Sequence, residues 1–523
     1  MQEPTKKEIV NILLKKGILV SPEFLEQLKN QNINIFLKKI QSKLSSQDFL
    51  VVNNEINKII KKDINWLDLE KSKVLSEKGK NKEIYPKFIE YATQQEKKNA
   101  SPAPTGNLRT KVVFSYKEES QKRDVQDFVS YFNARYKALE KLLQFRKELQ
   151  NIMSINRVVS KTNRETVSVI GMVKEKTHTK NNNLSLVLED PTGCIKVLIS
   201  RNKPELYNEA KDIVLDEVIG VVGTNGQNII FVNDVIWPSV PIKELKKAPD
   251  EAYVIFLSDL HVGSKQFLPN EFNRFLSWIN GETGTIQQRE IASKVKYLFI
   301  IGDLVDGCGV YPEQDAELLI KDIYQQYDEC ASLLKKIPSR IQIIICPGNH
   351  DAMRIAEPQP ELYKDFAQKI WDLPNAVMVS NPSLVNIHSD EKFPGFDVLI
   401  YHGYSFDYYV ANVDSIRNQG GYDRADLIMS FLLKRRHLAP TYKSTLYIPD
   451  TKTDPLVIEQ VPDFFVTGHI HKSIAANYKN ITTICGSCWQ SKTTFQEKVG
   501  HNPEPARIPI VNLQTRQIKI LKF

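Results

Sequence analysis

The C-terminal half of the chain alternates short apolar segments with stretches of helical periodicity. An apolar run of roughly four to eight residues between turns is typical of a buried strand, whereas apolar positions three and four apart indicate one face of a helix. Strands that alternate with helices form layered α/β domains. The pattern therefore predicts such a domain over residues 246–523, with strands at YVIFL, VKYLFII, RIQIIIC, AVMV, FDVLIY, DFFVT and ITTIC.

Between residues 155 and 245 the period changes to two, and turn signals such as Pro191-Thr192-Gly193 separate about five alternating segments. Five short strands predict a small closed barrel similar to an OB-fold, since closure removes exposed strand edges. OB-folds that bind single strands use aromatic side chains and positive charge. This segment is nearly neutral and offers mainly Tyr207, Phe231 and Trp237, so we favour a structural or partner-docking barrel.

The first 150 residues follow other patterns. Residues 1–70 carry apolar positions at helical spacing and predict a small helical module. Residues 71–125 include segments such as SPAPTG and predict a flexible basic linker. An apolar stripe returns within residues 126–154 and predicts a connector helix. The fold class expected from these segments together is a multidomain α+β protein.

Composition adds limits to this picture. The chain has 523 residues and a mass of 60.0 kDa, more than one hydrophobic core usually organises. Its mean hydropathy is −0.33, and it has no run of the ~18 apolar residues that span a bilayer. The first residues, MQEPTKKEIV, lack the apolar region of a signal peptide. We therefore expect a cytoplasmic protein that does not enter a membrane. Six cysteines are too few for disulfide bonds to stabilise so long a chain, which favours a reducing compartment.

Charge is concentrated near the N-terminus. The chain carries +8 overall, yet residues 1–150 alone hold 29 basic and 19 acidic side chains, or +10. The C-terminal half is slightly acidic by itself. A basic arm on a near-neutral body suits a polyanion-binding or tethering role, although a solvated lysine-rich linker produces the same balance.

Metal-binding and acid–base residue types follow five of the predicted strands directly. Strand ends at one edge of an α/β sheet converge on a single crevice, so these side chains are expected to meet. Five of the nine histidines in the chain stand at these positions. The residues are Asp259 and His261, then Asp303 and Asp306, then Asn349, His350 and Asp351, then His402, and last His469 and His471.

The donor types select the chemistry. Imidazole, carboxylate and amide donors without thiolate suit Mn²⁺, Fe or Zn in an open catalytic site. The set is large enough for two divalent ions that share a carboxylate, as in two-metal phosphoryl hydrolases. Mn²⁺ is the ion we favour, with Fe, Zn and Mg²⁺ as alternatives.

The motif series Asp259-x-His261, Gly302-Asp303-x-x-Asp306, Gly348-Asn349-His350-Asp351, His402 and Gly468-His469-x-His471 resembles the signature of the calcineurin-like metallophosphoesterases. The resemblance implies that Asp259, His261 and His471 bind one ion and that Asn349, His402 and His469 bind the other. It implies that Asp303 bridges both ions and that Asp306 lies behind the ligands. It further implies that His350 protonates the leaving oxygen while Asp351 orients the His350 ring.

A narrower resemblance rests on the domain order and on the segments LLKRRHLAPTY, PDFFVTGHIHK and SCWQSKTTFQ. From about residue 125 onward the chain resembles the small subunits of archaeal family D DNA polymerases. That resemblance implies a 3′→5′ proofreading exonuclease that acts on DNA and partners a large polymerising subunit. Two alternatives stay open: a stand-alone metallophosphoesterase on small phosphoesters, and a non-catalytic assembly subunit.

Other singled-out residues have competing explanations. Lys434, Arg435 and Arg436 either contact DNA phosphates or complement the C-terminus of their own helix. Tyr404 and Phe406 either stack on a terminal base or pack in the core. Cys485 and Cys488 are interpreted as packing beside the site, because no suitably spaced partners follow for a nucleophile or a zinc site. His388, near a polar turn, is expected at the surface.

Overall fold

A computed structural model of the chain describes residues 18–20, 50–52, 110–117, 122–450, 452–498 and 500–523. The chain divides into two compact units, Met1–Ser101 and Pro102–Phe523. In the first unit, β1 (Ile18–Val20) pairs in parallel with β2 (Leu50–Val52). The helices predicted for residues 1–70 lie outside the described residues.

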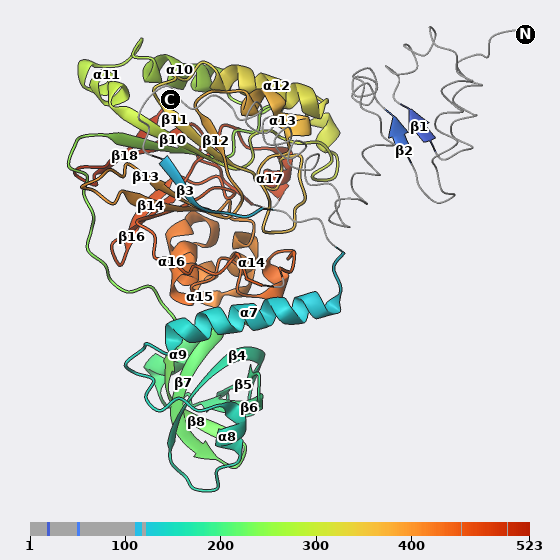
Figure 1. The fold of residues 1–523 in the computed structure, drawn as a ribbon, viewed down its shortest axis with the longest axis vertical. Helices are drawn as coiled ribbons and strands as arrows, with labels where there is room; N and C mark the ends of the chain where they lie inside the picture. Colours follow the sequence, from blue (N-terminus) through green and yellow to red (C-terminus); the bar gives the residue numbers. More distant parts are fainter. Residues whose placement is uncertain (1–17, 21–49, 53–109, 118–121, 451, 499) are drawn as a thin grey trace, which may run out of the picture. The chain divides into compact units, whose positions relative to one another are not determined.

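Two six-stranded sheets form the body of the second unit (Figure 1). The first has the order β12-β11-β10-β9-β18-β19, and β9 to β12 are parallel. This parallel set places the C-terminal ends of β9, β10 and β11 at one edge. The strands are β9 (Tyr253–Leu257), β10 (Val295–Ile301), β11 (Gln342–Cys346), β12 (Ala376–Met378), β18 (Arg507–Asn512) and β19 (Ile518–Lys522).

The second sheet has the order β16-β17-β15-β14-β13-β3, in which β14, β15 and β17 are parallel. All seven apolar segments predicted as strands are strands in the two sheets. The strands of the second sheet are β3 (Thr110–Ser115), β13 (Ser383–Ile387), β14 (Phe396–Ile400), β15 (Phe464–Thr467), β16 (Ile474–Tyr478) and β17 (Ile481–Cys485).

β3 corrects the sequence-based prediction. Residues 110–115 fall inside the predicted flexible linker, yet they pair antiparallel with β13 and form the edge of the second sheet. The β-branched and aromatic run Val112-Val113-Phe114 supplies the strand propensity. The polar flanks of this short run give the whole segment the composition of a linker.

The sheets pack face to face, and helices cover their outer faces. Successive residues of β9 show the layering: Phe256 belongs to the buried cluster between the sheets, whereas Ile255 and Leu257 belong to the cluster beneath the helices. The first sheet is covered by α10 (Pro269–Ile279), α12 (Ile323–Leu334) and α13 (Lys364–Trp371), with α11 (Ile286–Ser293) beside α10. The second is covered by α14 (Phe406–Asn412), α15 (Asp414–Asn418) and α16 (Ala425–Arg435).

The predicted barrel is present. Five strands close in the order β4-β5-β6-β8-β7 around an apolar core. These strands are β4 (Thr166–His178), β5 (Leu184–Asp190), β6 (Gly193–Ile199), β7 (Val218–Gly226) and β8 (Ile229–Ile236), with α8 (Ile155–Val159) before β4 and α9 (Pro204–Ala210) after β6.

One long helix, α7 (Val125–Leu143), joins the barrel to the sheets (Figure 1). Asp124 caps its N-terminus by accepting hydrogen bonds from main-chain N–H groups. Leu139 packs against barrel residues, whereas Arg135 pairs with Asp454 at 2.7 Å and both side chains are fully buried. No helix in the described ranges combines the length and hydropathy that crossing a bilayer requires.

Candidate metal centre

The carboxyl ends of five parallel strands from both sheets carry the predicted donor residues. β9 leads to Asp259 and His261, and β10 leads to Asp303. β11 leads to Asn349, β14 to His402, and β15 to His469 and His471. All but two of these residues are buried, and Asn349 and His469 are half-buried. The two packed sheets thus bring donors from distant parts of the sequence to one edge.

Several of these residues have left-handed backbone conformations. The φ angle is +51° for Asp259, His261 and Asp303, +70° for His469 and +54° for His471. A residue other than glycine is strained there by about 1–3 kcal/mol, and such strain clusters at functional sites. The backbone turns sharply after each strand, which directs these side chains into the same space.

The first donor group contains Asp259, His261 and His471, whose donor atoms lie within 4.8 Å of one another. Nε2 of His261 is 3.0 Å from Nε2 of His471, and Nε2 of His471 is 3.5 Å from Oδ1 of Asp259. Two imidazole nitrogens and a carboxylate oxygen at this spacing match one ion with an open position.

The second donor group contains Asp303, His402 and His469. Nε2 of His402 is 3.3 Å from Oδ2 of Asp303 and 2.9 Å from Oδ1 of Asn349. Asp303 is also 3.9 Å from Nε2 of His261 in the first group. The carboxylate of Asp303 therefore faces both groups.

Partners behind the histidines fix the orientation of their rings. Nδ1 of His261 contacts Oδ1 of Asp306 at 3.1 Å, and Nδ1 of His402 donates to the main-chain oxygen of Ile301 at 3.0 Å. Nε2 of His469 contacts Oδ2 of Asp407 at 3.0 Å. An acceptor on one ring nitrogen leaves the other nitrogen free to bind a metal.

Sequence reasoning expected Asp306 in this outer position and missed two others. Asp407 is on α14, and Gln496, whose Nε2 is 2.9 Å from Nδ1 of His471, is on α17 (Thr494–Lys498). α17 reaches the site through tertiary packing, whereas α14 begins four residues after His402. The one sequence signal was that Asp407 stands five residues after His402.

The glycines in the motifs leave space that a side chain would fill. A Cβ on Gly302, where φ is +74°, would lie 2.3 Å from Nδ1 of His402. A Cβ on Gly348 would lie 2.2 Å from Oδ1 of Asp303. Only glycine allows these donors to approach the backbone so closely.

The electrostatics of the cluster favour a positive charge. Burial alone would raise the pKa of Asp303, but the neighbouring His402 and His350 hold that pKa well below its usual range. Burial opposes protonation of His402, yet the adjacent Asp303 outweighs it and raises the pKa of His402 to about 10. The carboxylates thus remain ionised, as metal ligands must.

His350 forms a third group of possible metal donors with His261 and Asp306. Its main-chain N–H donates to Oδ1 of Asp303 at 2.8 Å, and its ring is 4.7 Å from the ring of His261. Its Nδ1 donates to the main-chain oxygen of Asp306 at 2.8 Å. Burial lowers the pKa of His350.

The expected role of Asp351 needs correction. Its carboxylate accepts hydrogen bonds from the main-chain N–H groups of Gly348 and Leu304 and from the Tyr327 hydroxyl, so it supports the loop. The carbonyl of Asp306, and not Asp351, holds the ring of His350. Burial raises the pKa of Asp351 to about 7.

The basic cluster at the end of α16 is not a free DNA-binding surface. Arg435 is 3% exposed and its Nε is 2.5 Å from Oε2 of Glu217 in the barrel, while Arg436 is equally buried and donates to the main-chain oxygens of Ile458 and Glu459. Lys434 pairs with Glu209 at 2.5 Å. The prediction of phosphate contacts is therefore wrong for both arginines, which join the barrel and the loop after α16 to the body.

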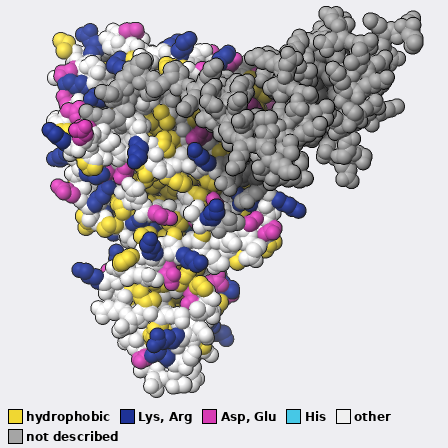
Figure 2. Space-filling model, in the orientation of Figure 1, with side chains coloured by type: hydrophobic (Ala, Val, Ile, Leu, Met, Phe, Trp, Pro, Cys, Tyr) yellow, Lys and Arg dark blue, Asp and Glu magenta, His cyan; other side chains and the backbone are white. Residues whose placement is uncertain are grey.

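The two aromatic candidates differ. Phe406 is fully buried in the core beneath α14, so it does not stack on a base. Tyr404 is half-buried, with its ring 5.8 Å from the ring of His469, and its predicted DNA contact stays a prediction. Figure 2 shows Lys, Arg, Asp and Glu side chains interspersed over the described part of the visible face, without one continuous basic stripe.

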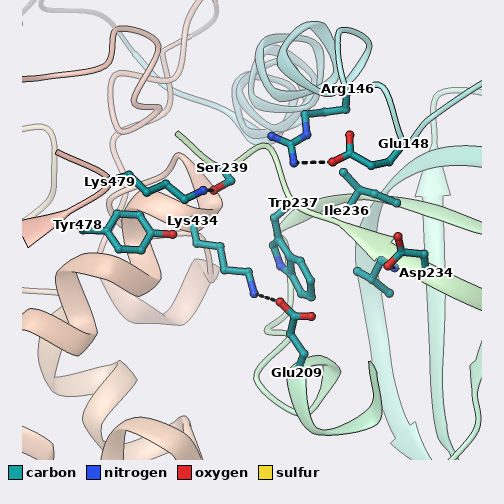
Figure 3. A pocket seen from close by; sticks show the side chains of 11 residues that line it. Arg146, Glu148, Glu209, Asp234, Ile236, Trp237, Ser239, Lys434, Tyr478 and Lys479 are labelled. Atoms are coloured by element: carbon teal, nitrogen blue, oxygen red, sulfur yellow. Dashed lines mark hydrogen bonds and ion pairs between the residues drawn. The ribbon is translucent and has the colours of Figure 1, made fainter. Parts of the chain in front are cut away.

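A cavity of about 330 Å³ lies where the barrel, the end of α7 and α16 meet (Figure 3). Lys434 and Trp237 meet at its wall, and the Lys434 ammonium lies 3.7 Å from the centre of the Trp237 ring. Arg146 pairs with Glu148 at its rim. None of its lining residues belongs to the metal-donor groups.

Known proteins resemble the chain over most of the second unit. Residues 254–475 match the family model that describes the B subunits of DNA polymerases alpha and epsilon. The chain is 39% identical over 400 residues to the DNA polymerase II small subunit of Methanothermobacter thermautotrophicus. This match covers 76% of this chain and 80% of that protein. It is 40% identical over 403 residues to the DNA polymerase II small subunit of Pyrococcus furiosus. That match covers 76% of this chain and 64% of the Pyrococcus protein.

Among solved structures, an archaeal phosphodiesterase aligns with 52% of this chain and 99% of its own chain. The sequence identity is 13% and the TM-score is 0.26. A likeness at that level supports no conclusion about function.

Proposed function

Because the chain belongs to the family of DNA polymerase II small subunits, the small subunits of archaeal family D DNA polymerases, we propose that it is the proofreading subunit of a two-subunit replicative polymerase. In this proposal it acts in the cytoplasm as a two-metal 3′→5′ exonuclease on DNA 3′ ends. Its partner is a large polymerising subunit.

One observation carries the proposal: the Asp303 carboxylate faces two separate groups of buried donors, at 3.3 Å from His402 and 3.9 Å from His261. A carboxylate shared by two ligand sets is what a pair of divalent ions requires. The donors are imidazole, carboxylate and amide groups, which suit Mn²⁺ best and also Fe, Zn or Mg²⁺.

The residues divide between two ions. Asp259, His261 and His471 would hold one ion and Asn349, His402 and His469 the other, with Asp303 between them. The buried thiols of Cys485 and Cys488 belong to neither donor group.

When bound, the ions lower the pKa of a water molecule and neutralise the charge on the phosphoryl oxygens. The chain supplies the remaining chemistry. His350 donates Nδ1–H to the Asp306 carbonyl, so it acts as the acid in its imidazolium form, whose Nε2–H passes to the departing 3′ oxygen. Asp351 and Tyr327 hold the loop that carries His350.

In this proposal the sheets and helices of the second unit form a calcineurin-like metallophosphoesterase fold, and the barrel is an OB-fold. The strand order β4-β5-β6-β8-β7 supports the OB-fold assignment. Of the barrel aromatics, Trp237 is buried and Phe231 is 41% exposed. A single well-exposed ring is little for single-strand binding, which supports a docking or structural role.

The test compares two substrates. The chain, alone and with the large subunit, should release mononucleotides from a 3′-mismatched primer much faster than it hydrolyses p-nitrophenyl phosphate. The opposite preference would favour a small-molecule phosphoesterase. If the chain binds the large subunit tightly but hydrolyses neither substrate, the alternative of a non-catalytic assembly subunit is supported.

A further inference from the structure

Asp407 is outside every motif of the proposed centre, yet it contacts one of the donors. It lies in the first turn of α14, and its Oδ2 is 3.0 Å from Nε2 of His469. His469 belongs to the donor group with Asp303 and His402. Its other oxygen, Oδ1, is buried and has no hydrogen-bond partner among the described residues.

This contact determines which nitrogen of His469 can bind a metal. A neutral imidazole has one N–H and one lone pair, and an ionised carboxylate only accepts hydrogen bonds. If Nε2 donates to Asp407, the lone pair is on Nδ1. Nδ1 is then the nitrogen left for an ion shared with Asp303 and His402.

His469 differs from its neighbours in this respect. His261 and His402 are held through Nδ1, by Asp306 and by the Ile301 carbonyl, which leaves Nε2 toward the other donors. His469 is held through Nε2 instead. A ring held by the opposite nitrogen needs its own acceptor, and Asp407 is the one that the described residues provide.

We propose that Asp407 is a positioning residue for the second ion: it holds His469 in the tautomer and orientation that direct Nδ1 to the ion shared with Asp303, His402 and Asn349. The inference rests on the proposed two-ion centre. Asp407 is not itself assigned as a ligand, since it contacts the nitrogen of His469 opposite the one that binds.

A positioning residue for one ion should affect the affinity for that ion alone, whereas a residue that only supports the fold should affect both. In the first donor group the outer carboxylate is Asp306, which contacts Nδ1 of His261. Removal of the Asp407 carboxylate should therefore lower the affinity for the second ion and leave the affinity for the first ion unchanged. Removal of such an outer partner typically costs about 10–100-fold in metal affinity.

The experiment is a Mn²⁺ titration of the full chain by calorimetry, with electron paramagnetic resonance to detect coupling between the two ions. Asp407→Ala should bind one ion as the wild type does and the second about 10–100-fold more weakly, with loss of the coupled signal at limiting Mn²⁺. Asp407→Asn keeps an amide oxygen that can accept from Nε2, so its loss should be smaller. Asp414→Ala removes an exposed carboxylate of neighbouring α15 that pairs with Arg417, and it should bind both ions normally.

Two results would overturn the inference. One is that Asp407→Ala binds both ions with wild-type affinity. The other is that Asp407→Asn and Asp407→Ala each lose as much affinity for the first ion as for the second. Failure of the proposed function has a different result. Wild-type chain that binds two coupled ions but cuts no DNA would contradict the exonuclease and leave the role of Asp407 standing. Wild-type chain that binds fewer than two ions would overturn both.

Discussion

Oδ2 of Asp303 lies 3.3 Å from Nε2 of His402, across the boundary between the two packed sheets. Asp303 follows a strand of one sheet and His402 follows a strand of the other. The site therefore depends on the packing of the sheets as well as on the loops. The same carboxylate is 3.9 Å from Nε2 of His261, which makes it the link between the two donor groups.

Asp303→Ala should lower the occupancy of both ions, because it removes a donor that faces both groups. Elemental analysis of the purified variant should find fewer than one Mn²⁺ per chain. Asp315→Ala is the matched control, since Asp315 is an exposed carboxylate paired with Lys321 and should not change metal content. Full metal loading of Asp303→Ala would refute the bridge.

His350→Ala should slow nucleotide release about 10²–10⁴-fold, the usual contribution of general acid–base catalysis, and leave metal content and subunit assembly unchanged. Single-turnover cleavage of a 3′-mismatched primer measures the effect. His178→Ala, at an exposed position on the barrel, should cleave at the wild-type rate. Cleavage by His350→Ala at that rate would rule out its role as the acid.

Arg435→Met should lower the free energy of unfolding by about 3–5 kcal/mol, because it leaves the Glu217 carboxylate buried without its partner. Adding Glu217→Leu should restore most of that loss, since an apolar pair of similar size can replace a buried ion pair. Denaturant unfolding measures both changes. DNA affinity, measured by fluorescence anisotropy, should be the same in both variants as in the wild type. A DNA-binding defect in an Arg435→Met variant of wild-type stability would contradict the structural role.

Acid should destabilise the junction around α7 through His437. Burial and the nearby Arg135 lower the pKa of His437 from 6.5 to about 4. The unfolded chain therefore binds a proton between those pH values that the folded chain does not, so stability falls as pH drops from about 6.5 to about 4. His437→Gln should show a shallower decrease in unfolding temperature over that range, and an unchanged slope would contradict the assignment.

The sequence predicted those features that depend on local pattern. Apolar runs located seven of the twelve strands of the two sheets, and period-two alternation located the barrel. The placement of Asp259, Asp303 and His402 after strands indicated where donors would meet, because parallel strands align their ends.

The corrections concern tertiary contacts. Arg435 stands at a helix end, where a cation is typical of the surface, and only the packed barrel supplies its partner Glu217. His388 was expected at the surface, yet it is 1% exposed and contacts Asp250 at 2.8 Å. No local pattern identifies partners from another domain or a distant strand. The same limit hid the contacts of Asp407 and Gln496 with the histidine rings.

The most direct test of the proposed centre measures primer shortening as a function of the Mn²⁺ bound per chain. Metal-free protein is titrated while bound ion and mononucleotide release from a 3′-mismatched primer are followed in the same samples. The two-ion exonuclease predicts release that rises with the second ion and is absent in Asp303→Ala. Two bound ions without any release, or release from metal-free protein, would contradict it.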